Sequence, residues 1–325
     1  MVPLRGRWFP CEADSAPGRP LVPLAAMSSS SGRLGGWAVR HAASLLLVAS
    51  IVLLTIVLVH RGSDILQQIP YVPDLQQPQL LPHEQIMIED IRANYLKPPS
   101  YEPYNLHENL KKDPSRGQTK VILEALKNMR NGFFVECGAL DGETRSNTLF
   151  MERFLGWTGL LVEADPSNFR KVLSKNRNAW SVNVCLNSRN VKSQVRFKPA
   201  FNVGKIARQN ASGTVEVDCF PLHALLLALD VRRVDYFSLD VEGAELDVLR
   251  TVPFDRIDIR TLSVEFAHTS GGGKPALRAF MESKGYTVIR EVKQKDWTAN
   301  DFIFVKNDTF SEEERRRLSA PYRRH

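Results

Sequence analysis

The chain has 325 residues, which suits one large domain or two small ones, so length alone decides little. It carries 43 Lys and Arg residues against 36 Asp and Glu, a net charge of +7, but the basic excess lies mainly in residues 1–61 and in the tail from Glu312. A nucleic-acid-binding protein should carry its basic charge on the folded part, so the distribution excludes that class.

The N-terminal part predicts a membrane anchor. Residues 1–41 are rich in Ser, Gly, Pro and Arg without a hydrophobic period, which is typical of a disordered segment. Residues 42–59 contain no charge, and a bilayer core needs about 17–25 apolar residues in a helix. A cleaved signal peptide has an apolar region of about 7–15 residues near the N-terminus, so we expect an uncleaved anchor. The arginines that precede it favour a cytoplasmic N-terminus, hence one span with type II topology.

Two further features agree with a lumenal or extracellular C-terminal part. The triplets that begin at Asn210 and Asn307 are glycosylation acceptors in such a compartment, although such triplets also occur by chance. Cys185 and Cys219 are candidates for a disulfide, and Cys137, within an apolar run, is expected to be a buried thiol. No Cys or His pair has metal-ligand spacing, so the sequence predicts no metal site.

Beyond the anchor, residues 60–117 predict a juxtamembrane spacer with one short helix, and residues 309–325 a charged tail. Between them, residues 118–308 alternate between helical and extended patterns, which indicates βαβ units and a largely parallel sheet in an α/β fold. Two final strands without a helix between them predict an antiparallel edge. The expected strands are residues 132–137, 159–165, 180–185, 193–201, 213–219, 234–241, 261–267, 286–293 and 301–307.

The first candidate site is the loop after the first of these strands, Glu136-Cys-Gly138-Ala-Leu-Asp141-Gly142. Ligands of such sheets bind beyond the carboxyl ends of the strands, where strand order reverses. A glycine there lets the backbone approach a ligand. Glu136 stands where the dinucleotide fingerprint has its first glycine, and an acid suits the ammonium group of S-adenosylmethionine. The alternative is a tight strand-to-helix turn without a ligand.

Acids at two other strand ends extend this candidate site. Glu163 follows Gly138 by about the interval at which a carboxylate accepts ribose hydroxyls. Asp240 and Glu242 end a later strand and could bind substrate or remove a proton from a hydroxyl nucleophile. Helix capping is the alternative for Glu242, and His268, near another strand end, is more often a surface residue than a base.

Three phrases, FFVECGALDGE, GLLVEADPSNF and DYFSLDVEGAELDVL, resemble the FkbM family of S-adenosylmethionine-dependent methyltransferases over about residues 132–306. The resemblance implies a Rossmann-like methyltransferase fold, with cofactor contacts at Glu136, Gly138, Gly142 and Glu163. The neighbouring Asp141 belongs to the same candidate cofactor loop. Asp240 and Glu242 would border the substrate.

A narrower resemblance, to the Star-like membrane proteins of arthropods, rests on three segments that follow a single predicted anchor. These segments are ECGALDGETRSNTLFMER, GLLVEADPSNFRKVL and KNRNAW. That resemblance implies trafficking of membrane-bound growth-factor precursors of the epidermal growth factor class between endoplasmic reticulum, Golgi and endosomes, with the plasma membrane as a further location. Two hypotheses therefore stand: a lumenal binding module in secretory trafficking, and an active O-methyltransferase on a glycan or another hydroxyl compound. A lumenal enzyme would need imported cofactor, because charged solutes do not cross a bilayer core unaided. The oligomeric state is open.

Overall fold

The computed structural model describes residues 80–107, 112–200, 204–207, 212–268, 272–294 and 299–320. They belong to one compact unit that begins at Gln79. The predicted anchor at residues 42–59 lies outside the described residues, and among the described helices none is long and apolar enough to cross a bilayer.

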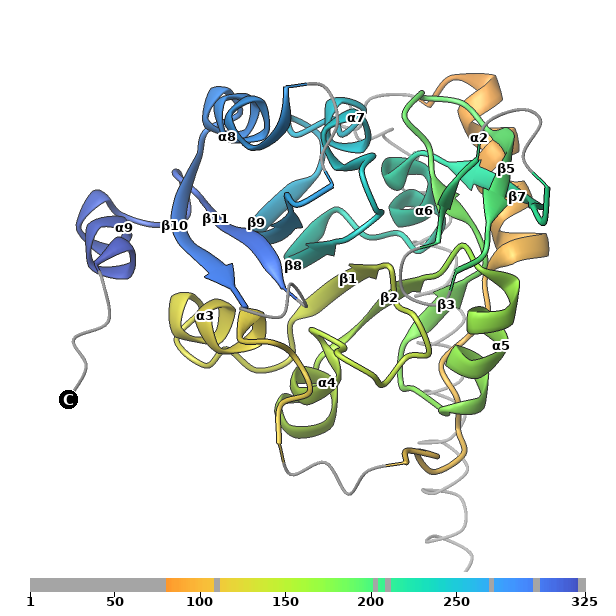
Figure 1. Cartoon of the computed structure of the whole chain (residues 1–325), viewed down its shortest axis with the longest axis horizontal. Helices are drawn as coiled ribbons and strands as arrows, with labels where there is room; N and C mark the ends of the chain where they lie inside the picture. Colours follow the sequence, from red (N-terminus) through yellow and green to blue (C-terminus); the bar gives the residue numbers. More distant parts are fainter. Residues whose placement is uncertain are drawn as a thin grey trace, which may run out of the picture. The chain divides into compact units, whose positions relative to one another are not determined.

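The centre is a seven-stranded sheet in the order β10-β11-β9-β8-β1-β2-β3 (Figure 1). Its parallel part consists of β1 (Phe133–Cys137), β2 (Thr158–Val162), β3 (Trp180–Val182), β8 (Arg233–Leu239) and β9 (Asp258–Glu265). The predicted α/β fold with a mostly parallel sheet is thus confirmed. Chain order reverses between β1 and β8, which makes their carboxyl ends the expected ligand site.

The antiparallel strand is not the outermost one. β11 (Asn300–Lys306) pairs antiparallel with both β9 and β10 (Tyr286–Lys293), so β10 at the edge runs parallel to the rest of the sheet. The predicted antiparallel pair is present, but its second strand is inserted between β10 and β9. This insertion buries β11 on both sides, which agrees with its nearly continuous apolar sequence.

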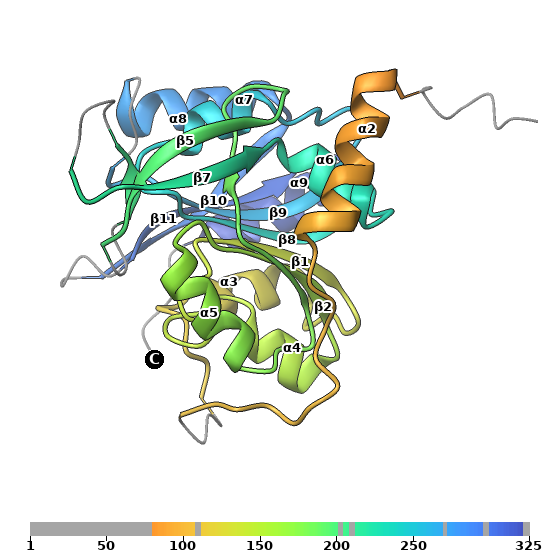
Figure 2. The same cartoon turned by 90° about the vertical axis from the view of Figure 1, so that its right-hand side faces the viewer.

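Helices cover both faces of the sheet (Figures 1 and 2). One face carries α3 (Gln118–Ala125), α4 (Leu149–Leu155) and α5 (Pro166–Ser174), packed on Phe134 and Tyr236. The other carries α6 (Leu222–Ala228), α7 (Glu245–Arg250) and α8 (Gly273–Ser283), packed on Val135 and Phe237. Alternate residues of β1 and β8 thus face opposite cores, as the two-residue period of a strand requires.

Segments on both sides of the predicted domain also join the core. α2 (Pro82–Asp90) and the following η1 (Ile91–Tyr95) bury Met87, Ile88 and Ile91 beside α6, so they do not form a free spacer. In the predicted charged tail, α9 (Glu312–Ser319) buries Leu318 in the cluster that includes α3. A solvated face around a few apolar residues hid these contacts from the sequence pattern.

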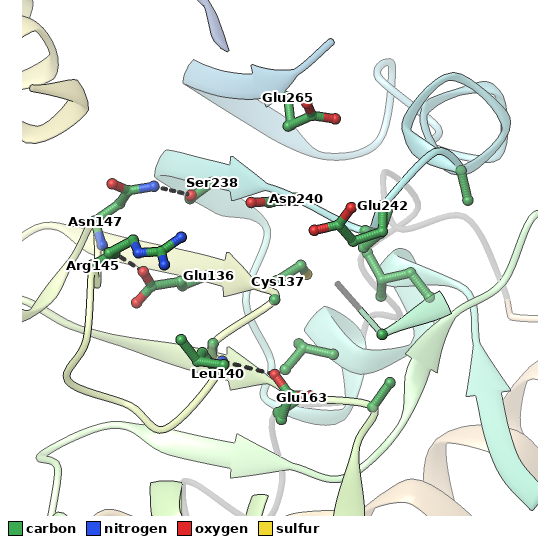
Figure 3. Close-up of a pocket in the computed structure, with 18 of the residues that line it drawn as sticks. Glu136, Cys137, Leu140, Arg145, Asn147, Glu163, Ser238, Asp240, Glu242 and Glu265 are labelled. Atoms are coloured by element: carbon green, nitrogen blue, oxygen red, sulfur yellow. Dashed lines mark hydrogen bonds between the residues drawn. The ribbon is translucent and has the colours of Figure 1, made fainter. Parts of the chain in front are cut away.

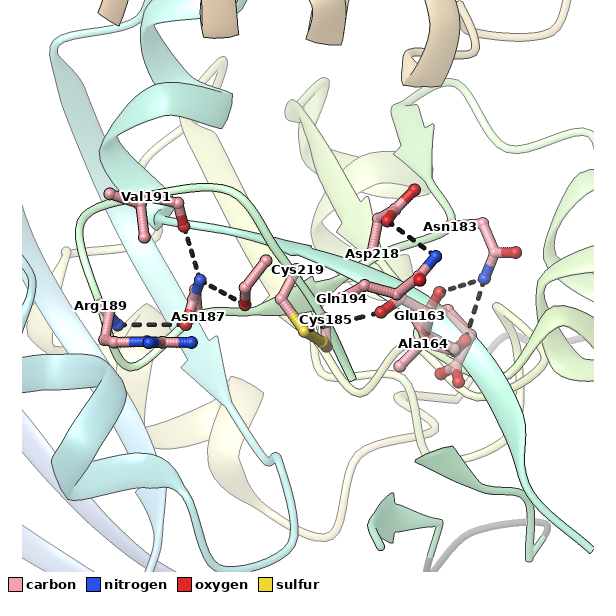
Figure 4. The surroundings of a disulfide bond; sticks show 12 residues. Glu163, Ala164, Asn183, Cys185, Asn187, Arg189, Val191, Gln194, Asp218 and Cys219 are labelled. Carbon is pink, nitrogen blue, oxygen red and sulfur yellow. Dashed lines mark hydrogen bonds between the residues drawn. A yellow bond between two sulfur atoms is a disulfide. The ribbon is translucent and has the colours of Figure 1, made fainter. Parts of the chain in front are cut away.

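A second, four-stranded sheet is inserted between β3 and α6. Its strand order is β4 (Cys185–Leu186), β7 (Val215–Phe220), β5 (Ser193–Lys198) and β6 (Lys205–Ile206). Cys185 and Cys219 are register partners on β4 and β7 and form a disulfide with a Cα–Cα distance of 4.4 Å (Figure 4). This is the pairing that the sequence suggested, and Cys137 is the buried free thiol.

Candidate functional site

A cavity of about 200 Å³ opens at the carboxyl ends of β1, β2, β8 and β9. The inserted sheet adds an apolar wall that includes Leu186, Phe197 and Ile206. The cavity is also lined by five strand-end acids that Figure 3 labels: Glu136, Glu163, Asp240, Glu242 and Glu265. The topological switch point of the sheet is therefore the place where the predicted residues meet.

Glu136, the last polar residue of β1, is buried and bound by the loop before α4. Its carboxylate accepts hydrogen bonds from Ser146 Oγ at 2.8 Å, Asn147 N at 2.5 Å and Thr148 Oγ1 at 2.6 Å. Burial raises its pKa, while the guanidinium of Arg177 and these donors oppose the rise. Glu136 lines the cavity, as expected, but its acceptor capacity is used to hold the loop rather than left for an ammonium group.

Gly138 lets the loop after β1 touch the end of β8. Its φ is +81°, and a Cβ added there would lie 2.2 Å from the carbonyl oxygen of Asp240. No L side chain fits this contact, and the conformation itself favours glycine. The glycine that the sequence singled out is therefore required by the approach of two backbone segments at the cavity.

Glu163, one residue beyond β2, lines the cavity and supports the same loop. Its Oε2 accepts the N–H of Leu140 at 2.7 Å and its Oε1 accepts the N–H of Asp165 at 2.8 Å. Burial raises the pKa of Glu163 to about 7, against the lowering effect of these two donors. Each oxygen of a carboxylate can accept more than one hydrogen bond, so Glu163 can also accept ribose hydroxyls.

Asp141 and Gly142, predicted as cofactor contacts, are not among the residues that line the cavity. The carboxylate of Asp141 accepts the N–H groups of Glu143 and Thr144 at 2.9 and 2.7 Å and the hydroxyl of Thr144 at 2.8 Å. Gly142, with φ +81°, packs against Val172 of α5. Both residues shape the loop from outside. A short polar residue before a glycine is equally typical of such a turn.

Asp240 lies just past the end of β8 at the floor of the cavity. Solvent reaches it through the opening, yet its carboxylate lies deep among protein atoms. This desolvation raises its pKa well above the usual range, and the neighbouring carboxylates of Glu242 and Glu265 raise it further. A carboxylate with a raised pKa is a stronger base once ionised.

Glu242, which follows β8, pairs with a histidine that comes after β9. Its Oε2 lies 3.0 Å from Nδ1 of His268, which also lines the cavity and is 57% exposed. Burial raises the pKa of Glu242, and His268 opposes the rise. Glu242 has a left-handed φ of +56°, and such strain is often found at functional sites. Glu242 does not cap α7, whose N-cap is Ala244, and Glu245 in the first turn accepts the N–H groups of Val241 and Gly243.

One carboxylate oxygen each of Asp240, Glu245 and Glu265 lies within 4.8 Å of the others, a spacing that a cation could bridge. The Cys and His spacing of the sequence could not reveal this group, because its members lie on three separate elements. Burial, with Glu245 close by, raises the pKa of Glu265 to about 8. Crowded acids of this kind also occur without an ion.

Arg145, Asn147 and Ser238 line the cavity but escaped the sequence pattern. Asn147 Nδ2 donates to Ser238 Oγ at 2.9 Å (Figure 3), while its buried Oδ1 has no hydrogen-bond partner among the described residues. Arg145 has a left-handed φ of +58°, and no hydrogen bond or ion pair of its guanidinium occurs within the described part of the chain. A polar triplet in a loop looks ordinary in sequence, so only the fold could reveal these residues.

The predicted glycosylation acceptors are differently placed. Asn210 lies outside the described residues, whereas Asn307 is exposed just after β11. The side chain of Asn307 accepts the hydroxyl of Thr287 at 2.6 Å. Its exposure is compatible with a glycan, and whether one is attached stays a prediction.

The residues of the cavity fit S-adenosylmethionine. Gly138 makes room for close backbone packing, Glu163 can accept ribose hydroxyls, and Asn147 offers a buried acceptor without a partner. Ala164, Leu140 and Val184 add small apolar surface beside Glu163. A ligand with a diol, an apolar ring and a polar end matches this set of groups.

Comparisons with known proteins agree with this fit. Residues 136–288 match the model of the methyltransferase FkbM domain. The methyltransferase sdnD of Sordaria araneosa is 33% identical over 76 residues, which are 23% of this chain and 28% of that protein. The chain thus matches less than a third of the length of this curated relative.

Solved structures with some similarity include magnesium protoporphyrin IX methyltransferase from Synechocystis, with bound S-adenosylmethionine. It is 11% identical, with a TM-score of 0.35 over 71% of this chain and all of that one. A protein of the NADB-Rossmann superfamily from Streptococcus agalactiae is 10% identical, with a TM-score of 0.36 over 64% of this chain and 76% of that one. Similarity at this level supports no conclusion about function.

The family match and the cavity together support S-adenosylmethionine as the cofactor. The matched segment includes Glu136, Gly138, Glu163, Asp240 and Glu242, the strand-end residues that the cavity brings together. Residues 136–288 of the Rossmann-like α/β domain are therefore similar to the methyltransferase FkbM domain.

Proposed function

We propose that the domain is an S-adenosylmethionine-dependent methyltransferase that acts on a hydroxyl group, such as that of a glycan. One observation carries the proposal: Glu163, suited to a ribose, and Asp240, suited to a proton, line the same cavity at the switch point of the sheet. A cofactor and an acceptor could therefore meet there without a large rearrangement.

The residues after β1 and β2 would bind the cofactor. Glu163 would accept the ribose hydroxyls, and the loop around Gly138 would hold the rest of the cofactor against the end of β1. When bound, S-adenosylmethionine supplies an electrophilic methyl group on a positively charged sulfur. Phe197 and Ile206 of the inserted sheet line the cavity and would reduce the contact of a bound ligand with water.

The acids after β8 would serve the acceptor. Asp240 or Glu242 would take the proton of the acceptor hydroxyl, while the oxygen of that hydroxyl forms a bond to the methyl carbon of the cofactor. The bond between that carbon and the cofactor's sulfur would break, and its electron pair would stay on sulfur. His268, 3.0 Å from Glu242, would keep that carboxylate oriented.

Calorimetry of the purified full-length chain with S-adenosylmethionine tests the first half of the proposal. We expect saturable binding, weakened about tenfold or more in Glu163→Ala because a carboxylate that accepts two hydroxyls is lost. Transfer of labelled methyl groups to a panel of glycans and polyols tests the second half. We expect transfer by the parent chain and none by Asp240→Asn together with Glu242→Gln. A folded chain without cofactor binding would contradict the proposal.

A second candidate function is a Star-like role in the export of membrane-bound growth-factor precursors from the endoplasmic reticulum. The disulfide between Cys185 and Cys219 favours it, because disulfides persist in oxidising compartments such as the secretory pathway. The predicted anchor and the Star-like phrases give it a topology and a class of cargo. Under this proposal the protein is a type II membrane protein of the endoplasmic reticulum, Golgi and endosomes.

Export of a precursor in cells that lack the protein tests this second function. We expect the precursor to stay in the endoplasmic reticulum, and normal export would contradict the role. Re-expression of the Glu163→Ala variant separates the two functions. Rescue by this variant would mean that export needs the domain but not its cofactor, whereas failure by a well-expressed variant would link export to cofactor binding.

A further inference from the structure

The loop between β1 and α4 contributes to the lining of the cavity two residues, Arg145 and Asn147, whose side chains carry unsatisfied groups of opposite character. We propose that Arg145 and Asn147 bind the α-amino-acid end of the cofactor. Arg145 would bind the cofactor's carboxylate, and Asn147 would bind the cofactor's ammonium group. The inference rests on the proposed use of S-adenosylmethionine and assigns the residues that hold one end of it. Neither residue was expected from the sequence.

The acid that first suggested an ammonium site is not free to form one. Glu136 already accepts hydrogen bonds from Ser146, Asn147 and Thr148. A carboxylate so engaged has little capacity left for a ligand. The bond from the backbone N–H of Asn147 is informative, because Asn147 also lines the cavity.

Asn147 is held by hydrogen bonds from both its backbone and its side chain. Its N–H donates to Glu136 at 2.5 Å and its Nδ2 donates to Ser238 Oγ at 2.9 Å. Ser238 in turn accepts from Ser263 Oγ at 3.4 Å, which places the amide in a network between β8 and β9. The remaining atom, Oδ1, is buried without a partner. A buried acceptor in this state costs about 1–3 kcal/mol, and a ligand N–H would remove that cost.

Arg145 supplies the complementary charge. Its backbone is left-handed, with φ +58°, a conformation that costs an L residue about 1–2 kcal/mol. The guanidinium lines the cavity without a hydrogen bond or ion pair among the described residues, and Figure 3 shows it beside Glu136 and Asn147. A guanidinium presents paired donors that match a carboxylate.

The two groups are separated by one residue, Ser146, whose hydroxyl is anchored to Glu136. A single carbon atom carries both the ammonium and the carboxylate of an α-amino acid. One donor and one acceptor on neighbouring residues of a fixed loop fit such a zwitterion. Glu163 lies on a different strand end, so the ribose and the amino acid would be held by separate elements (Figure 3).

Calorimetry with two probes tests the assignment on the full-length chain. S-adenosylhomocysteine carries the amino-acid end, and 5′-methylthioadenosine lacks it. For Arg145→Met and Asn147→Leu we expect about tenfold or greater loss of affinity for the first probe, because charge-assisted hydrogen bonds are lost. Affinity for the second probe should change less than about twofold. Asn147→Asp, which keeps an acceptor and adds charge, should retain or strengthen the binding of S-adenosylhomocysteine.

Arg170→Met is the matched control, because Arg170 is exposed on α5 and does not line the cavity. Thermal unfolding establishes that each variant is folded, and Arg145→Lys replaces the methionine variant if that one is not. Equal losses for both probes, or no loss, would overturn the assignment while the proposed function stands. Binding of neither probe by the folded parent chain would overturn both.

Discussion

The two ends of the cavity use the same residue type in opposite ways. After β1 and β2, the carboxylates of Glu136 and Glu163 are held by N–H and hydroxyl donors of the protein. After β8 and β9, burial raises the pKa values of Asp240, Glu242 and Glu265, and neighbouring carboxylates raise them further. At the first end the fold supplies donors to both acids, whereas carboxylates crowd the second end, where Glu242 faces His268 and Glu265 accepts the N–H group of Ala267.

This difference separates acids that stabilise the fold of a loop from acids that could take part in a reaction. An acid saturated by backbone donors fixes the shape of a loop, and its removal should affect stability first. Acids that repel one another are costly to the fold and are retained for a ligand or a proton. The position of an acid at a strand end therefore does not by itself distinguish a structural role from a chemical one.

The largest expected effect on stability is at the contact between the loop after β1 and the end of β8. Gly138→Ala places a methyl group against the Asp240 carbonyl, at 2.2 Å in the unrelaxed structure, and should lower the free energy of unfolding by more than about 4 kcal/mol. Gly285→Ala is the matched control, since φ is +83° there but nothing lies within 4 Å. It should cost about 1 kcal/mol. Urea unfolding measures both, and equal losses would mean that backbone conformation, rather than contact, requires Gly138.

The supporting acid comes next. Glu136→Ala leaves Ser146, Asn147 N and Thr148 without their acceptor, beside a buried Arg177, and should cost about 3 kcal/mol. Glu89→Ala, on the exposed side of α2, should change stability by less than about 0.5 kcal/mol. A loss of cofactor affinity without loss of stability in Glu136→Ala would mean that this acid binds ligand directly.

The disulfide tests whether the inserted sheet depends on covalent support. Replacing Cys185 and Cys219 together by serine opens a link across 34 residues and should cost about 2–3 kcal/mol. Thermal unfolding with and without reductant measures the effect in the parent chain. Equal stability of the oxidised and reduced forms would show that the wall of the cavity holds without the bond.

The last comparison concerns pH and takes one acid from each end. Burial raises the pKa of Glu163 to about 7 and that of Glu265 to about 8, from an ordinary value of 4.5. Above pH 4.5 the folded state therefore binds more protons than the unfolded state, so stability falls as pH rises. Glu163→Gln should remove part of this fall up to about pH 7, and Glu265→Gln part of it up to about pH 8. Stability that rises with pH across this range would contradict both shifts.

The sequence predicted the alternation of strands and helices, because the two-residue and 3.6-residue periods survive wherever one face is buried. It also found Gly138, Glu163 and Asp240, since a glycine or an acid after an apolar run is a local signal. The pairing of Cys185 with Cys219 was one option among few cysteines.

What the sequence could not supply depends on distant contacts. The donors that saturate Glu136 come from a loop ten residues later, and the partner of Asn147 is on β8. The docking of α2 on α6 and the insertion of β11 beside β9 join segments more than thirty residues apart. Local patterns carry no record of such neighbours.

A crystal structure of the chain with S-adenosylhomocysteine tests the central claim most directly. We predict the adenosine beside Glu163 after β2, with its ribose hydroxyls on that carboxylate and the amino-acid end at Arg145 and Asn147. The acids after β8 should stay free for an acceptor. A ligand bound elsewhere, or a cavity that remains without ligand at saturating concentration, would contradict the assignment of the two ends.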